Sequence, residues 1–266
     1  MTKKKKKRRL RLKGPLGAIR FRDPMTVILT VLLVVMTLGT GLKGCLHGIS
    51  GHVNICLDAA FGGDSKGYEG LVNEAEAAEK IVDELEALLE QDSRFTVTRT
   101  HKTGTSKTIA ERVETAEKAK ADLILSIQAP GSPDASKSGM TVYADEPSSS
   151  TNAKSLKAAQ AVADTFSSSG WKASVKYMYY EPIGTTDAKN GADVIYSMLK
   201  VDTDDTENKD LETWNLMEES DIPVVIVDTF YVTNRTDAGR FGNEDGYKEA
   251  AAIYYKALKE AYGFTD

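Results

Sequence analysis

The segment from Val53 to Gly63, VNICLDAAFGG, constrains the fold more than any other part of the chain. Its first five residues are mostly apolar, and the run breaks at Asp58 into small residues and a Gly-Gly pair. This pattern predicts a buried strand that runs into a tight turn. In an open α/β sheet, ligand sites form at the carboxyl ends of strands, so we expect Phe61 to lie at such a site. A phenyl group supplies neither a proton nor a metal ligand.

Further apolar and amphipathic segments predict the remainder of an α/β domain. We expect strands at 95–100, 122–127, 140–144, 172–180 and 223–228, a shorter strand within 194–201, and helices at 70–91, 106–119, 153–167, 211–218 and 247–262. Strands that alternate with helices are typical of parallel sheets. The sequence therefore predicts a single α/β domain with a twisted, mostly parallel central sheet flanked by helices, preceded by one transmembrane helix.

Charge divides the chain into two unequal parts. Residues 1–44 contain 12 Lys and Arg but one acid, whereas the remaining residues contain 22 bases and 38 acids. Residues 1–23 are too basic and too poor in apolar side chains to form a core, and we expect a disordered tail there. Membrane topology and contact with anionic lipids explain the basic run at 3–9, so we expect no nucleic-acid partner.

Residues 24–42 contain no charge and are rich in Val, Leu, Ile and Met. Their number is close to the ~20 that cross a bilayer as a helix. Because the basic residues precede this segment, the positive-inside rule places the tail in the cytoplasm and the rest of the chain outside the cell. We expect a single-pass membrane protein with an uncleaved signal anchor. The alternative is a lipoprotein modified at Cys45, because LKGC at 42–45 roughly resembles a lipobox.

Beyond the anchor, we expect a linker at 43–52 and one domain at 53–262. The chain has two cysteines, Cys45 and Cys56. Cys56 lies within the apolar strand, which favours a buried thiol over a disulfide. Low cysteine use outside the membrane is typical of a bacterium-like cell surface rather than of a disulfide-stabilised secreted module.

Three predicted strands end in polar or unusual residues that would share one edge of the sheet, namely Phe61, Gln128 and Asp228. Glu74 follows in the first turn of the next helix. The segments around these residues are LDAAFGG, EGLVNEAEAAEKIVDELEALL, ADLILSIQAPGS, SGMTVYA and IPVVIVDTFYVTN. Together they resemble the zinc-dependent N-acetylmuramoyl-L-alanine amidase family, over about Val53 to Tyr262.

The resemblance implies a zinc ion held by His, Glu and His, and a further Glu as general base. The base activates a water that attacks the lactyl-peptide amide of peptidoglycan. Two imidazoles and a carboxylate leave zinc an open position where bound water becomes acidic. On this sequence, the first His of the family turn D-P-G-H-G-G falls on Phe61, and the second, in S-I-H-A-N, on Gln128. The ligand Glu falls on Glu74 with one extra loop residue, or on Asn73 without it, and the base falls on Asp228.

Both zinc histidines are thus replaced, and Glu74 is the only retained ligand position. A phenyl ring cannot bind zinc, a carboxamide is a poor ligand, and an isolated carboxylate binds weakly. We therefore expect no zinc and no other cofactor. A metal site rebuilt from His101 or Asp58 is the alternative, although His101 is expected to lie away from the converging strand ends. Glu74 could instead be a solvated carboxylate favoured by the helix dipole, and Phe61 could fill the space of the metal.

We interpret the chain as a membrane-anchored, extracytoplasmic amidase-like domain associated with peptidoglycan. On this hypothesis it is a pseudoenzyme that binds the cell wall or regulates a cell-wall enzyme. The alternative is an active N-acetylmuramoyl-L-alanine amidase, a peptidoglycan hydrolase with an altered metal site. A third hypothesis is a structural surface domain without a ligand.

Overall fold

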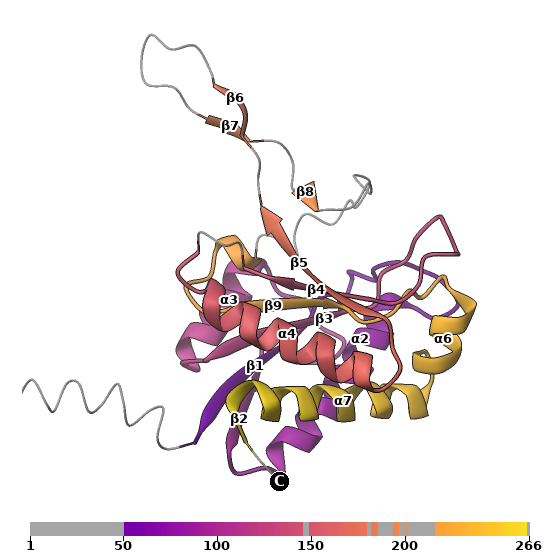
Figure 1. The fold of residues 1–266 in the computed structure, drawn as a ribbon, viewed down its shortest axis with the longest axis horizontal. Helices are drawn as coiled ribbons and strands as arrows, with labels where there is room; N and C mark the ends of the chain where they lie inside the picture. The colour runs from indigo at the N-terminus through magenta and orange to yellow at the C-terminus, as the bar shows by residue number, and fades with distance from the viewer. Residues whose placement is uncertain are drawn as a thin grey trace, which may run out of the picture. The chain divides into compact units, whose positions relative to one another are not determined.

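The apolar strands assemble into one seven-stranded sheet (Figure 1). The computed structural model describes residues 51–145, 149–179, 182–185, 194–196, 200–201 and 216–264. Its strands are β1 (Val53–Ala59), β2 (Phe95–Arg99), β3 (Leu123–Gln128), β4 (Met140–Ala144), β5 (Ala173–Tyr179), β6 (Pro182–Thr185), β7 (Val194–Tyr196), β8 (Lys200–Val201) and β9 (Val224–Asp228). Its helices are α2 (Glu74–Glu90), α3 (Ile109–Lys118), α4 (Asn152–Ser168), α6 (Arg235–Phe241) and α7 (Glu244–Tyr262).

The strand order in the large sheet is β2-β1-β3-β9-β4-β5-β8. The pairings of β1 with β2 and β3, of β3 with β9, and of β4 with β5 are parallel. Those of β4 with β9 and of β5 with β8 are antiparallel. The expected α/β domain is therefore confirmed, and its sheet is mixed, because β4 and β5 are reversed relative to β9. The strands β6 and β7 form a separate two-stranded sheet.

Alternate residues of the central strands enter two cores, one on each face of the sheet. On the first face, side chains such as Leu57, Leu125 and Val227 pack against α2, α4 and α7. Figure 1 shows α7 running alongside α2 and α4. On the second face, Ile124 and Ile226 pack with residues of α3. Burial on both faces explains why these strands read as continuous apolar runs.

The first core also contains the aromatic side chains that hold the helices together. Phe166 of α4 contacts Tyr254 of α7 edge to face, with ring centroids 4.8 Å apart, and Trp171 contacts Phe241 at the same distance. Such pairs favour a fixed geometry beyond the area that they bury. On the second face, Cys56 is fully buried, and burial raises its thiol pKa to about 12. The expected buried thiol is therefore confirmed.

The first helix begins four residues later than predicted. Residues 70–73 were expected to be helical, but Asn73 is the N-cap of α2, and its side-chain oxygen accepts the Glu76 N–H at 3.0 Å. Leu71 fits the apolar spacing of the helix, yet its side chain is 57% exposed and its N–H donates to the Val232 carbonyl. A local capping interaction therefore makes the helix begin after the hydrophobic pattern begins.

Some predictions fall outside the described residues. The expected transmembrane segment at 24–42, the tail before it and Cys45 lie there, as does most of the helix expected at 211–218. Among the helices of the described ranges, none is both long enough and apolar enough to cross a bilayer. The helix α6 was not predicted, because it has only seven residues and lacks an extended apolar pattern.

Asp237 of α6 fastens two loops to each other from a fully buried position. Its carboxylate accepts hydrogen bonds from the Ser138 hydroxyl at 2.6 Å and from the backbone N–H groups of Gly139 at 3.0 Å and Tyr231 at 3.1 Å. We expect Asp237→Ala to lower the free energy of unfolding by about 3 kcal/mol, because buried donors lose a charged acceptor. Urea unfolding at pH 7 measures this loss.

The matched control is Asp164→Ala on α4, where the aspartate is exposed and accepts from Gln160. We expect that substitution to change the free energy of unfolding by less than about 0.5 kcal/mol. Equal effects of the two substitutions would contradict the role assigned to Asp237.

Candidate functional site

Three parallel strands bring the predicted site residues to one edge of the sheet. The strands β1, β3 and β9 are neighbours, and Gln128 pairs with Asp228 in register at their carboxyl ends. Phe61 follows β1, whose last residue pairs with β3 one position before Gln128. Strand alternation turns Gln128 and Asp228 toward the same face of the sheet. The predicted convergence of these strand ends is confirmed.

Phe61 fills the space between the end of β1 and the start of α2. Its side chain is 5% exposed and belongs to a small apolar cluster with Ala60 and Ala75. Ala75 is the second residue of α2. The aromatic ring therefore packs against the turn of helix that carries Glu74, and it contributes apolar contact where the sequence pattern predicted a ligand site.

Glu74 is the first residue of α2, and its side chain is directed into the structure. The residue is 4% exposed, so the alternative of a solvated carboxylate is wrong. Its Oε2 accepts the Tyr68 N–H at 2.8 Å, and its own N–H donates to the Tyr68 carbonyl at 3.0 Å. Gly67 allows this approach, because a Cβ at that position would lie 2.9 Å from Glu74 and its φ is +62°. Glu74 thus holds the loop before its own helix.

Gln128 and Asp228 are both buried, with 4% and 6% of their surfaces exposed. Within the described residues, Gln128 Nε2 has no hydrogen-bond acceptor. Asp228 Oδ2 accepts the Tyr143 hydroxyl at 3.2 Å. Burial raises the pKa of Asp228 to about 7, against the opposing effects of the Tyr143 hydrogen bond and the Lys176 charge. The carboxyl group therefore carries a proton in a large fraction of molecules at neutral pH.

His101 lies at the carboxyl end of β1, contrary to the expectation that it would lie away from the strand ends. Its Nε2 is 2.8 Å from the Ala59 carbonyl and 4.0 Å from Asp58 Oδ1. The residue reaches this position because Thr100, just before it, is bound to β1 through the Leu57 carbonyl. The sequence pattern predicts that a strand ends at residue 100, but it does not predict that the next residue turns back toward the end of β1.

The Asp58 carboxylate is satisfied by protein donors. It is fully buried and accepts the Thr100 hydroxyl at 2.5 Å and the Ser126 hydroxyl at 2.7 Å. The Arg112 guanidinium lies 3.5 Å from Oδ2 and donates to the Ala60 carbonyl at 2.9 Å. A cation held this close opposes binding of a metal ion, so the geometry does not favour a metal site rebuilt from Asp58 and His101.

A loop formed by residues 62–73 crosses the strand ends and is fastened on both sides. Its Leu71 N–H donates to the Val232 carbonyl at 2.8 Å, and the Val232 N–H donates to the Pro130 carbonyl at 2.9 Å. The Tyr68 ring lies directly on Gly131, where a Cβ would come within 2.1 Å of the ring. The loops that follow β1, β3 and β9 are thus joined, and the residues beneath them are buried.

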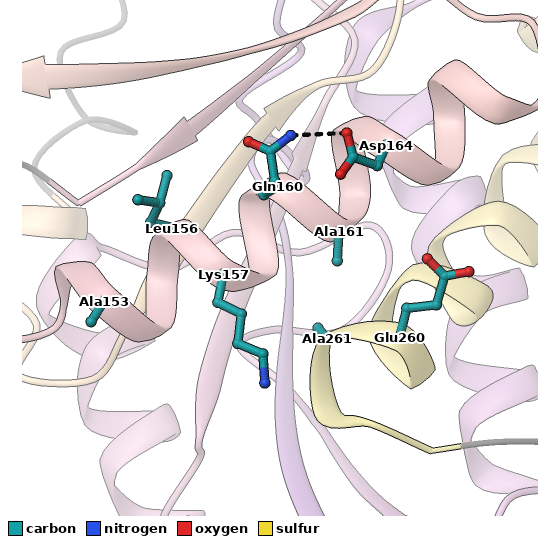
Figure 2. Close-up of a pocket in the computed structure, with 8 residues that line it drawn as sticks. All are labelled: Ala153, Leu156, Lys157, Gln160, Ala161, Asp164, Glu260 and Ala261. Atoms are coloured by element: carbon teal, nitrogen blue, oxygen red, sulfur yellow. Dashed lines mark hydrogen bonds between the residues drawn. The ribbon is translucent and has the colours of Figure 1, made fainter.

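Two hollows on the described surface lie elsewhere. One, of about 510 Å³, lies between α4 and α7 (Figure 2). It is lined by Leu156 and by small or polar side chains, and the Gln160 amide donates to Asp164 at 2.9 Å. The other, of about 770 Å³, lies at the carboxyl end of β2. Phe61, Glu74, Gln128 and Asp228 line neither of these hollows.

The residues at the strand ends do not provide a set of zinc ligands. Phe61 has no donor atom, and Gln128 offers only a carboxamide. In the described ranges, no group of three or more His, Cys, Asp or Glu side chains is placed to hold a metal ion. Sequence reasoning missed Tyr143 and Tyr68, which contact Asp228 and Glu74 respectively. The period-two pattern of β4 places Tyr143 on the face of Asp228, but only the antiparallel register brings the two together.

Comparisons with known proteins agree on one family. The profile described as N-acetylmuramoyl-L-alanine amidase matches residues 55–260. The solved catalytic domain of CwlV, an N-acetylmuramoyl-L-alanine amidase from Bacillus (Paenibacillus) polymyxa var. colistinus, is similar with a TM-score of 0.60 and 18% identity, over 80% of this chain and 99% of that chain. The N-acetylmuramoyl-L-alanine amidase AmiC2 of Nostoc punctiforme is similar with a TM-score of 0.59 and 19% identity, over 78% of this chain and 96% of that chain.

A third similar structure is the CwlD amidase from Clostridioides difficile in complex with the GerS lipoprotein. Its TM-score is 0.54 and its identity 14%, over 80% of this chain and 100% of that chain. At these identities, the solved structures show a common fold. A comparison with curated proteins gave no match.

The unpaired amide of Gln128 generates a stability prediction. We expect Gln128→Met to leave the free energy of unfolding unchanged or to raise it by about 1–3 kcal/mol, because it removes a buried donor that lacks an acceptor. Gln160→Met, at an exposed position on α4, is the control and should change stability by less than about 0.5 kcal/mol. A large loss at Gln128 would show that the amide has a partner.

The raised pKa of Asp228 generates a pH prediction. Between pH 4 and 7 the folded protein binds a proton that the unfolded chain releases, so this carboxyl lowers stability as the pH rises. We expect Asp228→Asn to become progressively more stable than the parent over this window, by up to about 4 kcal/mol. Urea unfolding at several pH values measures the difference, and a constant difference would show that the pKa is ordinary.

Proposed function

The chain belongs to the N-acetylmuramoyl-L-alanine amidase family, and from this membership we propose that it acts at peptidoglycan as an amidase-like domain without zinc and without hydrolytic activity. In this role it binds the cell wall or a cell-wall enzyme. The family is known to use zinc, and the residues at the corresponding positions here are Phe61, Gln128 and Glu74. Asp228 stands at the position of the catalytic Glu.

One observation carries the proposal: all four of these positions are occupied by residues that are only 4–6% exposed. A hydrolase of a wall polymer must admit the scissile amide to its metal and base. Here Phe61 packs on the start of α2, and Glu74 holds the Tyr68 N–H. The edge of the sheet that a substrate would approach is covered by the 62–73 loop.

The replacements of the two zinc histidines, by Phe61 and by Gln128, reinforce each other. A single lost histidine could leave a weakened metal site, but the loss of both leaves one carboxylate, which binds zinc weakly. Tyr143 donates to the carboxylate of Asp228, and burial favours its protonated form.

A binding role is compatible with a closed catalytic edge. Adhesion to a wall polymer or to a protein uses the outer surface and needs no metal. One similar structure, the CwlD amidase, was solved with the GerS lipoprotein, so a domain of this fold can form a complex with a protein. We further propose that residues 24–42 anchor the chain in the membrane, with residues 1–23 in the cytoplasm and the domain outside the cell. The uncharged segment and its basic flank support this topology.

The competing function is that of an active amidase with an altered metal site. It predicts that the protein releases free amino groups from purified peptidoglycan, and that a chelator or Glu74→Ala abolishes the release. The arrangement of Asp58, His101 and Arg112 gives this alternative no additional support, because the guanidinium stands beside the carboxylate.

We expect the full chain to sediment with insoluble peptidoglycan, or to retain a cell-wall enzyme, while releasing no free amino groups. A zinc-dependent amidase of the family, assayed in parallel, shows that the substrate is competent. Release of amino groups that is sensitive to a chelator would overturn the loss of catalysis. Absence of both hydrolysis and binding would leave the structural-domain hypothesis in its place.

A further inference from the structure

The hollow at the carboxyl end of β2 has features of a binding site that the amidase-like edge does not use. We call it the β2 groove, and it is lined by Arg99, Lys102, Thr103 and Lys107, together with Glu86 and residues of the same loop. Its volume of about 770 Å³ is within the range of small-molecule sites.

The loop of residues 100–107, which forms one wall of the groove, is held in place by α2. The Thr103 hydroxyl donates to Asp83 at 2.7 Å, and the Gly104 N–H donates to Glu79 at 2.6 Å. Gly104 has a φ of +74°, a conformation that favours glycine. The lysines at either end of this loop are therefore carried by an ordered backbone.

The acids near the groove are already engaged by protein donors. Asp83 accepts from Thr103 and also forms an ion pair with Arg99. Glu86 lies 3.4 Å from Arg99 Nη1, and partial burial is the main cause that raises its pKa. Glu79 accepts from Gly104. Because these carboxylates already accept hydrogen bonds from the protein, the groove has more hydrogen-bond donors than free acceptors.

Among the described residues, the two lysine ammonium groups of the groove have no anionic partner, whereas the Arg99 guanidinium already pairs with Asp83 and Glu86. Arg99 Nη2 is buried and has no acceptor in the described part of the chain. Among the same residues, the Lys102 ammonium makes no ion pair, and Lys107 Nζ contacts only the neutral Thr115 hydroxyl, at 3.0 Å. The chain beyond residue 44 has a strong excess of acids, whereas the lining of the groove has one arginine and two lysines against the single carboxylate of Glu86.

We propose that the β2 groove binds a phosphoryl group. A phosphoryl group presents several charged acceptor oxygens, which suit two ammonium groups beside a guanidinium better than the single charge of a carboxylate does. Thr103 and Thr105 add hydroxyl groups to the same wall. The ligand can be a phosphate-bearing wall polymer or the headgroup of an anionic lipid, because both offer this chemistry.

Equilibrium dialysis of the full chain against radiolabelled inorganic phosphate, at constant ionic strength, tests the proposal. We expect saturable binding that weakens at least tenfold in Lys102→Gln/Lys107→Gln. Both lysines are exposed, and Lys107 contacts Arg112 through its backbone carbonyl, so the substitutions preserve the fold. The control Lys154→Gln/Lys157→Gln removes the same charge from exposed positions of α4 and should bind like the parent.

Absence of phosphate binding, or equal weakening in the two double variants, would overturn the site. Acetate that competes as strongly as phosphate would overturn the phosphoryl class. Two further arms then distinguish the sources: a soluble glycerol-phosphate oligomer, and vesicles that contain phosphatidylglycerol. If binding of the oligomer or of the vesicles is lost in Lys102→Gln/Lys107→Gln, that result supports the groove and identifies the source of the phosphoryl group. These outcomes are independent of zinc content and hydrolysis, so they do not decide the proposed function.

Discussion

The structure depends on the parallel alignment of β1, β3 and β9, which are buried on both faces. This alignment forces the residues that follow the three strands to one edge of the sheet, whatever their chemistry. In a catalytic member of the family, that edge would hold metal ligands and a base. In this chain the same constraint brings together Phe61, Gln128 and Asp228, and the loops around them have closed over the position.

Glu74 shows what a buried carboxylate at this edge does in the structure. It stands at the start of α2, next to Ala75, on which Phe61 packs, and its carboxylate accepts the N–H of Tyr68. Tyr68 in turn lies on Gly131, in the loop after β3. The carboxylate at the position proposed for a metal ligand therefore links two loops. Its contacts within the closed edge account for a buried carboxylate there without a metal.

Much of the fold could be predicted from the sequence, because doubly buried strands leave continuous apolar runs and the helices leave regular apolar spacing. The strand β4, for example, has the predicted bounds. The convergence of Phe61, Gln128 and Asp228 followed from parallel topology. Long-range contacts could not be predicted: His101 returns to β1, Leu71 leaves the helix pattern to meet Val232, and Tyr143 reaches Asp228 through an antiparallel pairing. No local pattern records these contacts, since each depends on the register of another element.

The most direct test of the central claim is the amount of zinc per molecule in the full chain purified without chelators. Inductively coupled plasma mass spectrometry should find far less than one equivalent in the parent and close to one in Phe61→His/Gln128→His/Asp228→Glu. Adding Glu74→Ala to that variant should remove the zinc again, which identifies the third ligand. Stoichiometric zinc in the parent would contradict the account, because the metal would then be held by residues other than these.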